Sequence, residues 1–339
     1  MSALGTRIAA VLRTPEACVG ALDEVLDRLH TRRFGDAPIA LFLLSPALAI
    51  LSVFGLFPLG YAVYMSLFGA RWGMGPFVGL ANYGEVLRSG AFWNSFLVTT
   101  YYSVGTIPAT MVFSFIIARL LFGIVRGRGL LRTMYFLPYV TSAVAAAMVW
   151  RGILNPKFGL ANPLLEWFGF EAQNWLLEPR SVLNLLTNGA VPAHVGPSLA
   201  LCCVMMFEVW HGSGFMIVIF LAGLSTIPRE LEEAARIDGA NALQVVRNVT
   251  LPLLSPTIFF LAIVSVIKSF QAFNSFFALT GDGHGPLDTT QNMTVYIYSE
   301  FYEFHRWGYG TAVATMLCLA IVMLTWVQWR YVGRRVHYE

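Results

Sequence analysis

The stretch LEEAARIDGANALQVVRNVTLPLLSP, from Leu231 to Pro256, is a short polar segment between two long apolar runs. It begins with glutamates that are followed by two adjacent small residues, Ala234 and Ala235, and Gly239 comes four residues later. Charged and amide side chains are concentrated here, although the chain around them is strongly hydrophobic. This contrast indicates that the segment leaves the apolar environment in which its neighbours lie.

Helix signals divide the segment into two short helices. Ser225 or Thr226 can cap the first helix, and Pro228 fits its first turn, where the missing N–H of proline is not needed. Gly239 can adopt the left-handed conformation that ends a helix, and Pro252 is expected to end the second one. Three glutamates lie near the positive end of the first helix dipole, namely Glu230, Glu232 and Glu233. The pattern therefore predicts a compact hairpin of helices.

The composition of the 339 residues is typical of a membrane protein. The chain is 57% hydrophobic and 12% charged, with a mean hydropathy of +0.64, whereas soluble domains carry roughly 25% charged residues. The formal net charge of +3 gives no indication of nucleic-acid binding. The four cysteines have neither a CxxC nor a metal-ligand spacing, and those in apolar runs are expected to be small buried hydrophobic residues.

Six apolar stretches are long enough to cross a membrane, which takes about 20 residues for roughly 30 Å of hydrocarbon. The first is too long for the apolar core of a signal peptide, so it is expected to remain as an anchor. The sequence therefore predicts an all-α, polytopic membrane protein with six transmembrane helices. The predicted spans are Pro38–Phe68, Phe92–Phe122, Leu130–Leu154, Ser198–Leu224, Pro256–Thr280 and Trp307–Val332.

Basic residues are distributed unevenly between the two sides of the predicted membrane. Cytoplasmic loops carry an excess of Lys and Arg, and most of the 22 basic residues fall on the side of the N-terminus. Both termini and the polar hairpin are therefore expected to be cytoplasmic. The basic residues on this side are Arg7, Arg13, Arg28, Arg32, Arg33, Arg119, Arg126, Arg128, Arg132, Arg229, Arg236, Arg247, Arg330, Arg334 and Arg335.

The chain divides into an N-terminal segment and a membrane domain. Residues 1–36 have apolar residues at helical spacing and are expected to form a cytoplasmic amphipathic helix, solvated or lying on the membrane surface. Residues 37–339 are expected to form the six-helix domain. Within it, residues 154–197 are a long extracytoplasmic loop that contains Trp, Pro and Gly, and residues 225–255 are the cytoplasmic hairpin.

The hairpin resembles the EAA loop of ABC-importer membrane subunits, and the matching residues are Glu233-Ala234-Ala235, Gly239 and Leu251-Pro252. From about residue 37 onward, the chain is similar to the carbohydrate-uptake branch, which includes maltose-, trehalose- and glycerol-3-phosphate-type permeases. The similar stretches are RTMYFLPYV (Arg132–Val140), NPKFGLANPLL (Asn155–Leu165) and FYEFHRWGYGTAVATMLCLAIVML (Phe301–Leu324). The resemblance implies a type I ABC importer permease core in a bacterial inner membrane. The long segment before residue 37 departs from the short tails common in that branch.

The resemblance further implies that the hairpin is a coupling helix that lies in a cleft of a cytoplasmic ATPase. Closure of the ATPase would then tilt the attached spans between inward-open and outward-open states. The chain has no GxxxxGK[ST] phosphate loop, so it is expected to be a transport subunit and not an enzyme, without a cofactor of its own. ATP and Mg²⁺ would be bound by the partner. The expected coupling residues are Glu232, Glu233, Ala234, Ala235, Asp238, Gly239, Leu251 and Pro252.

A set of partners is implied in the same way. A second homologous permease subunit would complete a heterodimer, and two ATP-binding subunits would dock on its cytoplasmic side. An extracytoplasmic solute-binding protein would deliver the solute to the outer loops. The lipid membrane surrounds the spans, and no nucleic acid is expected.

Polar residues inside two of the predicted spans recur at one spacing, i, i+3, i+4 and i+7, which places them on one helix face. The first set is Glu208, His211, Gly212 and Phe215, and the second is Ser265, Lys268, Ser269 and Ala272. A charge near mid-bilayer costs roughly 2.5–3.5 kcal/mol on insertion scales, so such residues face a bundle interior or a wet cavity. Glu208 and Lys268 could neutralise each other there.

The resemblance aligns both sets with positions that line the sugar site in maltose-type permeases, with Asn274 and Gln271 as adjacent candidates. The maltose pattern has amides and an aromatic residue where this chain has Glu208, His211 and Lys268. Maltose itself is therefore in doubt, and a hydroxyl-rich or charged ligand held by ionic hydrogen bonds is indicated.

Structural interpretations of the same residues stay open. Glu208 and Lys268 could form an ion pair between packed spans, and Lys268 could also extend its side chain to the membrane surface. His211 could serve packing or hydrogen bonding. The other three candidates could simply pack helices together, since small residues let membrane helices approach, and these are Gly212, Phe215 and Ala272.

The leading interpretation is a permease subunit that forms half of the pathway for a di- or oligosaccharide, such as trehalose or a maltose-like sugar. The same architecture could import glycerol-3-phosphate or a glycerophosphodiester. An ion-coupled secondary transporter, with Glu208, His211 and Lys268 as a proton relay, would leave the hairpin without a role. An intramembrane hydrolase is disfavoured because no Ser/His/Asp or HExxH arrangement is found in the sequence.

Overall fold

The computed structural model describes residues 37–71, 73, 75–123, 127–193 and 195–333. The predicted amphipathic segment 1–36 lies outside these residues, as do three arginines that entered the orientation argument, Arg126, Arg334 and Arg335. By its internal contacts the chain separates into two compact units, Met1–Tyr64 and Met65–Glu339. The boundary between the units falls inside the first predicted span.

The described part of the first unit is one interrupted apolar helix. It consists of α3 (Ala37–Leu51), a π-helical stretch η1 (Ser52–Leu56) and α4 (Phe57–Met65), whose last residue already belongs to the second unit. Residues Ala40–Met65 have a hydropathy of 2.3 and are long enough to cross a membrane. A helix that is apolar all round suits a lipid environment, so this element agrees with the first predicted span.

The second unit consists of helices joined by turns, and the described residues contain no β-strand beyond two isolated bridges, Phe68 with Phe77 and Ser181 with Ser198. The all-α prediction is therefore confirmed. Its elements, with 3₁₀ and π stretches labelled η, are α5 (Ala81–Arg88), α6 (Gly90–Gly123), α7 (Arg128–Val140), α8 (Ala143–Ile153), α9 (Ala161–Trp167), η2 (Trp175–Leu177), α10 (Val182–Leu186), α11 (Leu199–Thr226), α12 (Arg229–Ile237), α13 (Ala242–Val245), η3 (Val246–Thr250), α14 (Leu251–Leu253), α15 (Ser255–Phe270), α16 (Asn274–Thr280), η4 (Pro286–Asp288), α17 (Met293–Tyr298), η5 (Ser299–Glu303) and α18 (Trp307–Tyr331).

Four of the predicted spans are helices long and apolar enough to cross a membrane in the described chain. These are Ala40–Met65, α6, α11 and α18, and two further bent pairs bring the number to six if each pair is one span. The third predicted span, Leu130–Leu154, is not straight, because α7 and α8 meet at 93°. Ser142 caps α8 by accepting a hydrogen bond from the Ala145 N–H, and the Thr141 hydroxyl bonds back to the Pro138 carbonyl. These local bonds compensate the backbone groups that the break exposes.

The fifth predicted span, Pro256–Thr280, is also corrected. Its helix α15 ends at Phe270 and a separate helix, α16, begins at Asn274. The side chains of Asn292 and Thr294 donate hydrogen bonds to the Ala272 carbonyl oxygen inside this break. At its other end, α15 bends by 70° from the segment Ala242–Leu253. Hydrogen bonds from residues distant in sequence thus stabilise this break, which the apolar sequence of residues 256–280 does not predict.

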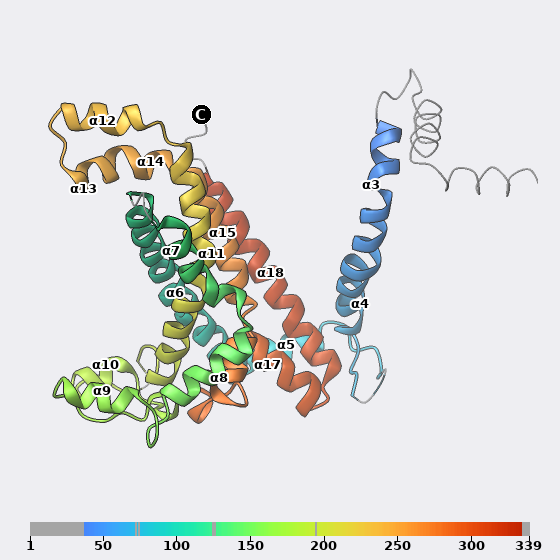
Figure 1. The fold of residues 1–339 in the computed structure, drawn as a ribbon. Helices are drawn as coiled ribbons and strands as arrows, with labels where there is room; N and C mark the ends of the chain where they lie inside the picture. Colours follow the sequence, from blue (N-terminus) through green and yellow to red (C-terminus); the bar gives the residue numbers. More distant parts are fainter. Residues whose placement is uncertain (1–36, 72, 74, 124–126, 194, 334–339) are drawn as a thin grey trace, which may run out of the picture. The chain divides into compact units, whose positions relative to one another are not determined.

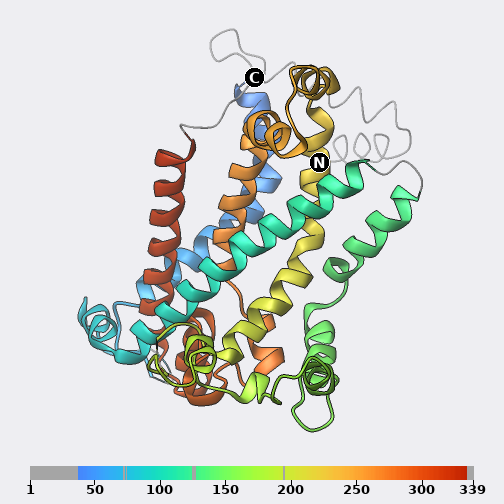
Figure 2. The same cartoon turned by 90° about the vertical axis from the view of Figure 1, so that its left-hand side faces the viewer.

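Helix α11 lies at the centre of the second unit and packs against α6 and α7, and Figure 2 shows the long helices crossing there. Phe207 and Phe220 of α11 are fully buried in this core. A Cβ atom at Gly214 would lie 2.7 Å from the Tyr135 carbonyl oxygen of α7, so only glycine permits this close approach. The crossing fixes the walls between which polar side chains gather.

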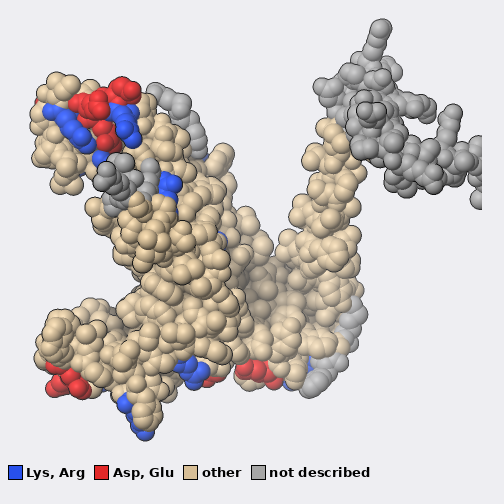
Figure 3. Space-filling view, viewed as in Figure 1, with Lys and Arg blue, Asp and Glu red and all other residues tan. Residues whose placement is uncertain are grey.

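The polar hairpin and the long loop lie at opposite ends of the second unit. In Figure 1, α12 and α13 lie at the top, and α9 and α10 of the loop 154–197 lie at the bottom. Figure 3 shows Lys, Arg, Asp and Glu side chains gathered at these two ends with an uncharged surface between them. This distribution is the one expected for a protein whose middle lies in lipid.

Candidate functional site

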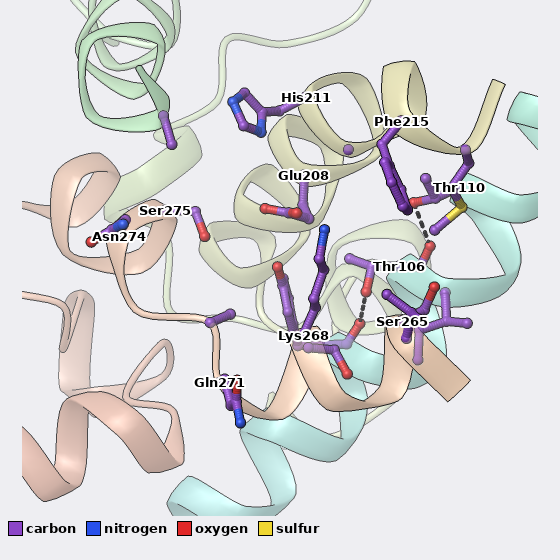
Figure 4. A pocket seen from close by; sticks show the side chains of 18 of the residues that line it. Thr106, Thr110, Glu208, His211, Phe215, Ser265, Lys268, Gln271, Asn274 and Ser275 are labelled. Atoms are coloured by element: carbon purple, nitrogen blue, oxygen red, sulfur yellow. Dashed lines mark hydrogen bonds between the residues drawn. The ribbon is translucent and has the colours of Figure 1, made fainter. Parts of the chain in front are cut away.

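A polar cavity of about 270 Å³ lies between the long helices of the second unit (Figure 4). Its walls come from α6, α7, α11, α15 and α16. All nine residues that the sequence indicated as a solute site line this one cavity, and they are Glu208, His211, Gly212, Phe215, Ser265, Lys268, Ser269, Ala272 and Asn274. Gln271, the further candidate, lines it as well.

The two sets of four residues lie on facing helices, as their equal spacing predicted. The first set is on α11, and Figure 4 shows Glu208 and His211 directed toward the space between the helices. The second set is on α15, whose Lys268 side chain extends into the same space. Asn274 opens α16 just beyond the break in the fifth predicted span. Two stretches about 60 residues apart thus form one site because the 3.6-residue period turns both faces inward.

Lys268 contacts aromatic groups in this cavity. Its ammonium donates a hydrogen bond to the Tyr139 hydroxyl, with 3.3 Å between the heavy atoms. It also lies 4.5 Å from the centre of the Phe215 ring and 5.3 Å from that of Tyr139, distances that favour cation–π attraction. The side chain therefore lines the cavity instead of reaching for the membrane surface.

Glu208 and Lys268 do not form the direct ion pair that was considered from the sequence, since no such pair occurs among the described ion pairs. The physical reason is that the Lys268 ammonium turns to the Tyr139 hydroxyl, while Glu208 lines the cavity together with Tyr102 and Ser275. The Lys268 ammonium forms no ion pair with a carboxylate of the described chain, so it is available to a ligand in the cavity.

His211 combines packing with an unsatisfied polar atom. Its ring stacks on Phe207, with 5.4 Å between ring centres and 18° between planes, and lies near Tyr139 at 6.2 Å. Its Nε2 atom is buried and has no hydrogen-bond partner in the described chain. A buried polar atom without a partner calls for an explanation, and a ligand in the adjacent cavity is one. Both sequence interpretations of His211, packing and a polar contact, therefore have support.

Sequence reasoning missed the wall that α6 contributes. Tyr102, Thr106 and Thr110 line the cavity at intervals of four residues, and Tyr139 of α7 and Ser275 of α16 line it too. The Thr106 and Thr110 hydroxyls bond back to the carbonyls of Tyr102 and Thr106, at 2.6 and 2.7 Å. A signal existed in the sequence, because hydroxyl residues recur at every third or fourth position of this otherwise apolar helix.

The polar hairpin has the turn that the sequence predicted. Helix α12 ends at Ile237, and Gly239 follows in the left-handed region with φ of +85°. The Ala240 N–H donates to the Ala235 carbonyl oxygen at 3.0 Å, which is the hydrogen bond of a Schellman motif. Gly239 is therefore the residue that reverses the chain.

Two details of the hairpin differ from expectation. Ser225 and Thr226 do not cap α12; they belong to the last turn of α11, where their hydroxyls bond back to the Ala222 and Gly223 carbonyls. Such back-bonding competes with capping, and Pro228 takes the N-cap position without a side-chain bond. The second helix begins with an unpredicted capping box, in which Asn241 and Gln244 bond each other's backbone N–H.

The expected coupling residues differ in exposure. Glu233, Ala234, Asp238 and Gly239 are exposed, and Ala235 is half-buried. Leu251 and Pro252 are half-buried in α14 at the bend before α15. Two apolar side chains beside the turn are unusually open to solvent, Ile237 at 86% and Leu243 at 75%. Glu232 is different, with 18% of its side chain exposed and a close contact to Arg119.

The outer end of the unit is held together by polar side chains. In the loop 154–197, the Asn162 side chain bonds the Pro156 and Gln173 backbone, and the Trp175 indole donates to it at 2.7 Å. The Arg180 guanidinium donates two hydrogen bonds to Glu178, which holds the pKa of that carboxyl below its usual range. The long loop 154–197 is thus a folded element and not an unstructured connection.

Among the described residues, no group of three or more His, Cys, Asp or Glu side chains could hold a metal ion. The cysteines in the described chain, Cys202, Cys203 and Cys318, are free. The site therefore consists of hydrogen-bonding, charged and aromatic side chains.

Comparison with known proteins places this geometry in a family. Residues 97–338 match the binding-protein-dependent transport system inner membrane component. A probable ABC transporter permease protein of Pyrococcus horikoshii is 30% identical over 307 residues, covering 89% of this chain and 99% of that protein. An sn-glycerol-3-phosphate transport system permease protein of Agrobacterium fabrum is 30% identical over 90% of this chain and 98% of its own length. A trehalose/maltose transport system permease protein of Thermococcus litoralis is 29% identical over 89% and 96%.

A solved structure agrees with the fold. A chain of a bacterial ABC transporter involved in the import of the acidic polysaccharide alginate superposes with a TM-score of 0.69 at 20% identity, over 88% of this chain and 96% of that chain. The resemblance read from the EAA-like hairpin is thereby confirmed at the level of fold and family. This chain belongs to the inner membrane components of binding-protein-dependent transport systems, and it is an ABC transporter permease, a transport component and not an enzyme.

Proposed function

We propose that this permease forms half of a translocation pathway for a sugar and that its hairpin couples the pathway to a cytoplasmic ATPase. The observation that carries the proposal is the connection between hairpin and cavity. Helix α11 supplies one wall and continues through Ile227 and Pro228 into α12, while α13 and α14 lead into α15, which supplies another wall. A force on α12 therefore acts on two walls of the cavity at once.

The surface of the hairpin supports docking of a protein partner. Small and acidic residues, Ala234 and Glu233, lie exposed on α12 next to the rigid turn at Gly239. Ile237 and Leu243 add apolar area that would be buried on docking. Glu233 can pair with a basic group of the ATPase, which would hold ATP and Mg²⁺, since the sequence of this chain contains no phosphate loop.

The chemistry of the cavity supports a hydroxyl-rich solute. Glu208, Gln271 and Asn274 offer strong hydrogen-bond groups, and the Tyr139 and Phe215 rings offer faces for apolar sugar surfaces. At about 270 Å³, the cavity is smaller than the roughly 300–1,000 Å³ usual for small-molecule sites. Half of a site that a second permease subunit completes would have this size. We therefore place di- and oligosaccharides first, and a relative named for trehalose and maltose agrees with this choice.

A glycerol-3-phosphate-like solute is the second candidate. Lys268 has no carboxylate partner among the described ion pairs, and a phosphate oxygen could take that place. Relatives named for sn-glycerol-3-phosphate transport are 30% identical over about nine-tenths of this chain. Because Glu208 lies in the same cavity and opposes a strongly anionic ligand, we keep this solute second.

The assembly proposed around the chain follows the same reasoning. A second, homologous permease subunit forms a heterodimer with it, two ATP-binding subunits dock on the hairpins, and a solute-binding protein delivers solute to the outer end. The hairpin end is cytoplasmic in this arrangement, and so are both termini. A structural relative solved in complex with a periplasmic protein fits this scheme.

The test is the substitution Glu233→Lys in the complete transporter, reconstituted with its binding protein. We expect normal membrane insertion and at least a tenfold loss of ATP-dependent uptake, because a repelled or misaligned ATPase cannot transmit its closure. Arg132→Glu in α7 also reverses the charge of an exposed residue but lies outside the hairpin and the loop 154–197, and it serves as the matched control. Undiminished uptake in Glu233→Lys would disprove the coupling role.

A further inference from the structure

One glutamate of the hairpin faces the spans instead of the solvent. Glu230 and Glu233 of α12 are exposed, whereas 18% of the Glu232 side chain is accessible. Residue 232 lies on the face of α12 opposite to much of the exposed surface, because successive residues of a helix are turned by about 100°. The resemblance to EAA loops grouped Glu232 with residues that meet the ATPase, but its environment is intramolecular.

Both carboxylate oxygens of Glu232 already have partners in this chain. Oε2 accepts a hydrogen bond from the Arg119 guanidinium of α6 at 2.9 Å and lies 3.6 Å from the Arg236 guanidinium one turn along α12. Oε1 accepts from the Thr250 hydroxyl of η3 at 3.2 Å, and Thr250 is fully buried. One side chain thus connects three elements, namely α6, α12 and the η3 stretch that precedes α14 and α15.

The connection to α6 is the one that the chain does not provide covalently. Helices α11 and α15 are joined to the hairpin by short backbone links, but α6 precedes it by more than a hundred residues. Yet α6 supplies the hydroxyl wall of the cavity at Tyr102, Thr106 and Thr110. Arg119 is nine residues beyond Thr110 on the same helix, about 13 Å at 1.5 Å per residue.

We propose that Glu232 is a positioning residue that ties the hairpin to α6 through Arg119, so that the cavity walls on α6, α11 and α15 all follow the hairpin when it moves. This inference rests on the proposed function, in which an ATPase moves α12. The pair lies at the cytoplasmic end of α6 with 26% and 18% of the two side chains exposed, where partial desolvation strengthens a charged hydrogen bond. Glu233 remains the residue that meets the partner.

The experiment uses the complete transporter in proteoliposomes and measures solute moved per ATP hydrolysed. Four variants are compared: Glu232→Arg, Arg119→Glu, the exchanged pair R119E/E232R, and Glu232→Gln, which keeps the size of the side chain and a polar acceptor for Thr250. We expect each single charge reversal to retain the ATPase on purification but to lower the solute-to-ATP ratio at least tenfold. The exchanged pair should recover the ratio to within about threefold of the unmodified transporter, because the guanidinium and the carboxylate meet again.

The matched control is Arg132→Glu, which reverses the charge of an exposed arginine of α7 that lies outside the hairpin and has no described ion pair. We expect its ratio to stay within about twofold of the unmodified transporter. If Glu232→Arg fails to reach the membrane, Glu232→Gln decides: a threefold or larger loss of the ratio supports the inference, and an unchanged ratio overturns it.

Two results would overturn the inference and leave the proposed function standing. One is loss of the ATPase from the purified Glu232→Arg complex without recovery in the exchanged pair, which would make Glu232 a contact to the partner. The other is a normal ratio in both single reversals. Failure of the proposed function itself would appear elsewhere, as normal uptake in Glu233→Lys.

Discussion

At the scale of single residues, the cavity is defined by groups whose hydrogen-bonding capacity the chain leaves partly unused. Lys268 has one hydroxyl partner and two aromatic faces, and His211 Nε2 has no partner among the described residues. Glu208 lines the same cavity together with Tyr102 and Ser275. The unused capacity of the first two groups is therefore what a solute would meet.

Replacing Lys268 with Met removes this cation while keeping an unbranched side chain of similar length. A hydrogen bond to a charged group contributes about 1.5–3 kcal/mol, so we expect the apparent affinity for the solute, read from solute-stimulated ATP hydrolysis, to fall about tenfold to a hundredfold. The complex should still assemble, because Lys268 pairs with no carboxylate of the described chain. Lys157→Met, at an exposed position of the outer loop, is the control.

Loss of assembly in Lys268→Met would instead assign Lys268 a structural role between packed helices. Measuring complex yield and solute response on the same preparation separates the two outcomes. The variant that binds less but assembles normally is the one that the cavity geometry predicts.

The sequence could predict the residues of the candidate site where their i, i+3, i+4, i+7 spacing lay within a single helix. Equal spacing was enough to bring Glu208 and Lys268 to facing walls, since the helical period alone decides the face. Tyr139 and Ser275 were missed because they reach the cavity only through the 93° and α15–α16 breaks. A direct pair of Glu208 and Lys268, which the sequence left open as one alternative, does not occur among the described ion pairs, and Lys268 contacts Tyr139 instead.

At the scale of secondary-structure elements, the hairpin turn depends on a backbone conformation that few residues adopt. Gly239 has φ of +85°, and the Schellman hydrogen bond from Ala240 to Ala235 requires it. An exposed helix of nine residues has little other support at this end. The turn therefore keeps α12 and α13 in a fixed relation.

Gly239→Ala should loosen the hairpin without changing the spans. A left-handed conformation costs a residue with a Cβ about 1–2 kcal/mol, so hairpin amides should exchange hydrogen roughly five- to thirtyfold faster, as followed by mass spectrometry. Gly84→Ala in α5 is the matched control, because Gly84 is helical, has a normal φ and has open space around it. Equal exchange in both variants would show that the turn does not limit hairpin stability.

The breaks in the third and fifth spans show what sequence patterns cannot supply at this scale. The length of an apolar run indicates how long a span is. It does not show where a distant side chain will hydrogen-bond a backbone group and so allow the helix to break. The Ala272 carbonyl accepts hydrogen bonds from Asn292 and Thr294, about twenty residues further along the chain at the start of α17. Hydrophobicity therefore predicted two apolar segments that count as spans if each bent pair of helices is one span. Local hydrogen bonds of Thr141 and Ser142 accompany the first break, and tertiary hydrogen bonds to Ala272 accompany the second.

At the scale of the whole molecule, the second unit has a hairpin at one end, a folded loop at the other and a polar cavity between helices that link them (Figure 1). The uneven distribution of basic residues had predicted that the hairpin and the loop 154–197 lie on opposite sides, because positively charged side chains are concentrated on one side of a membrane. Its elements contain neither an ATP-binding motif nor a metal cluster within the described residues. In the proposed function, energy for transport enters from the partner ATPase.

This dependence separates an ATP-driven importer from an ion-coupled carrier. In proteoliposomes, the chain alone should give no uptake above that of protein-free vesicles, because the proposed pathway needs a second permease subunit and the ATPases. With the second permease, the ATPases and the binding protein, uptake should need enclosed ATP and should change by less than about twofold when a protonophore removes the proton gradient. A relay of Glu208, His211 and Lys268 would give the opposite result, uptake without ATP that collapses with the gradient. Under that outcome the exposed face of α12 would have no partner to move it, and the connection from the hairpin to the cavity walls would have to serve packing alone.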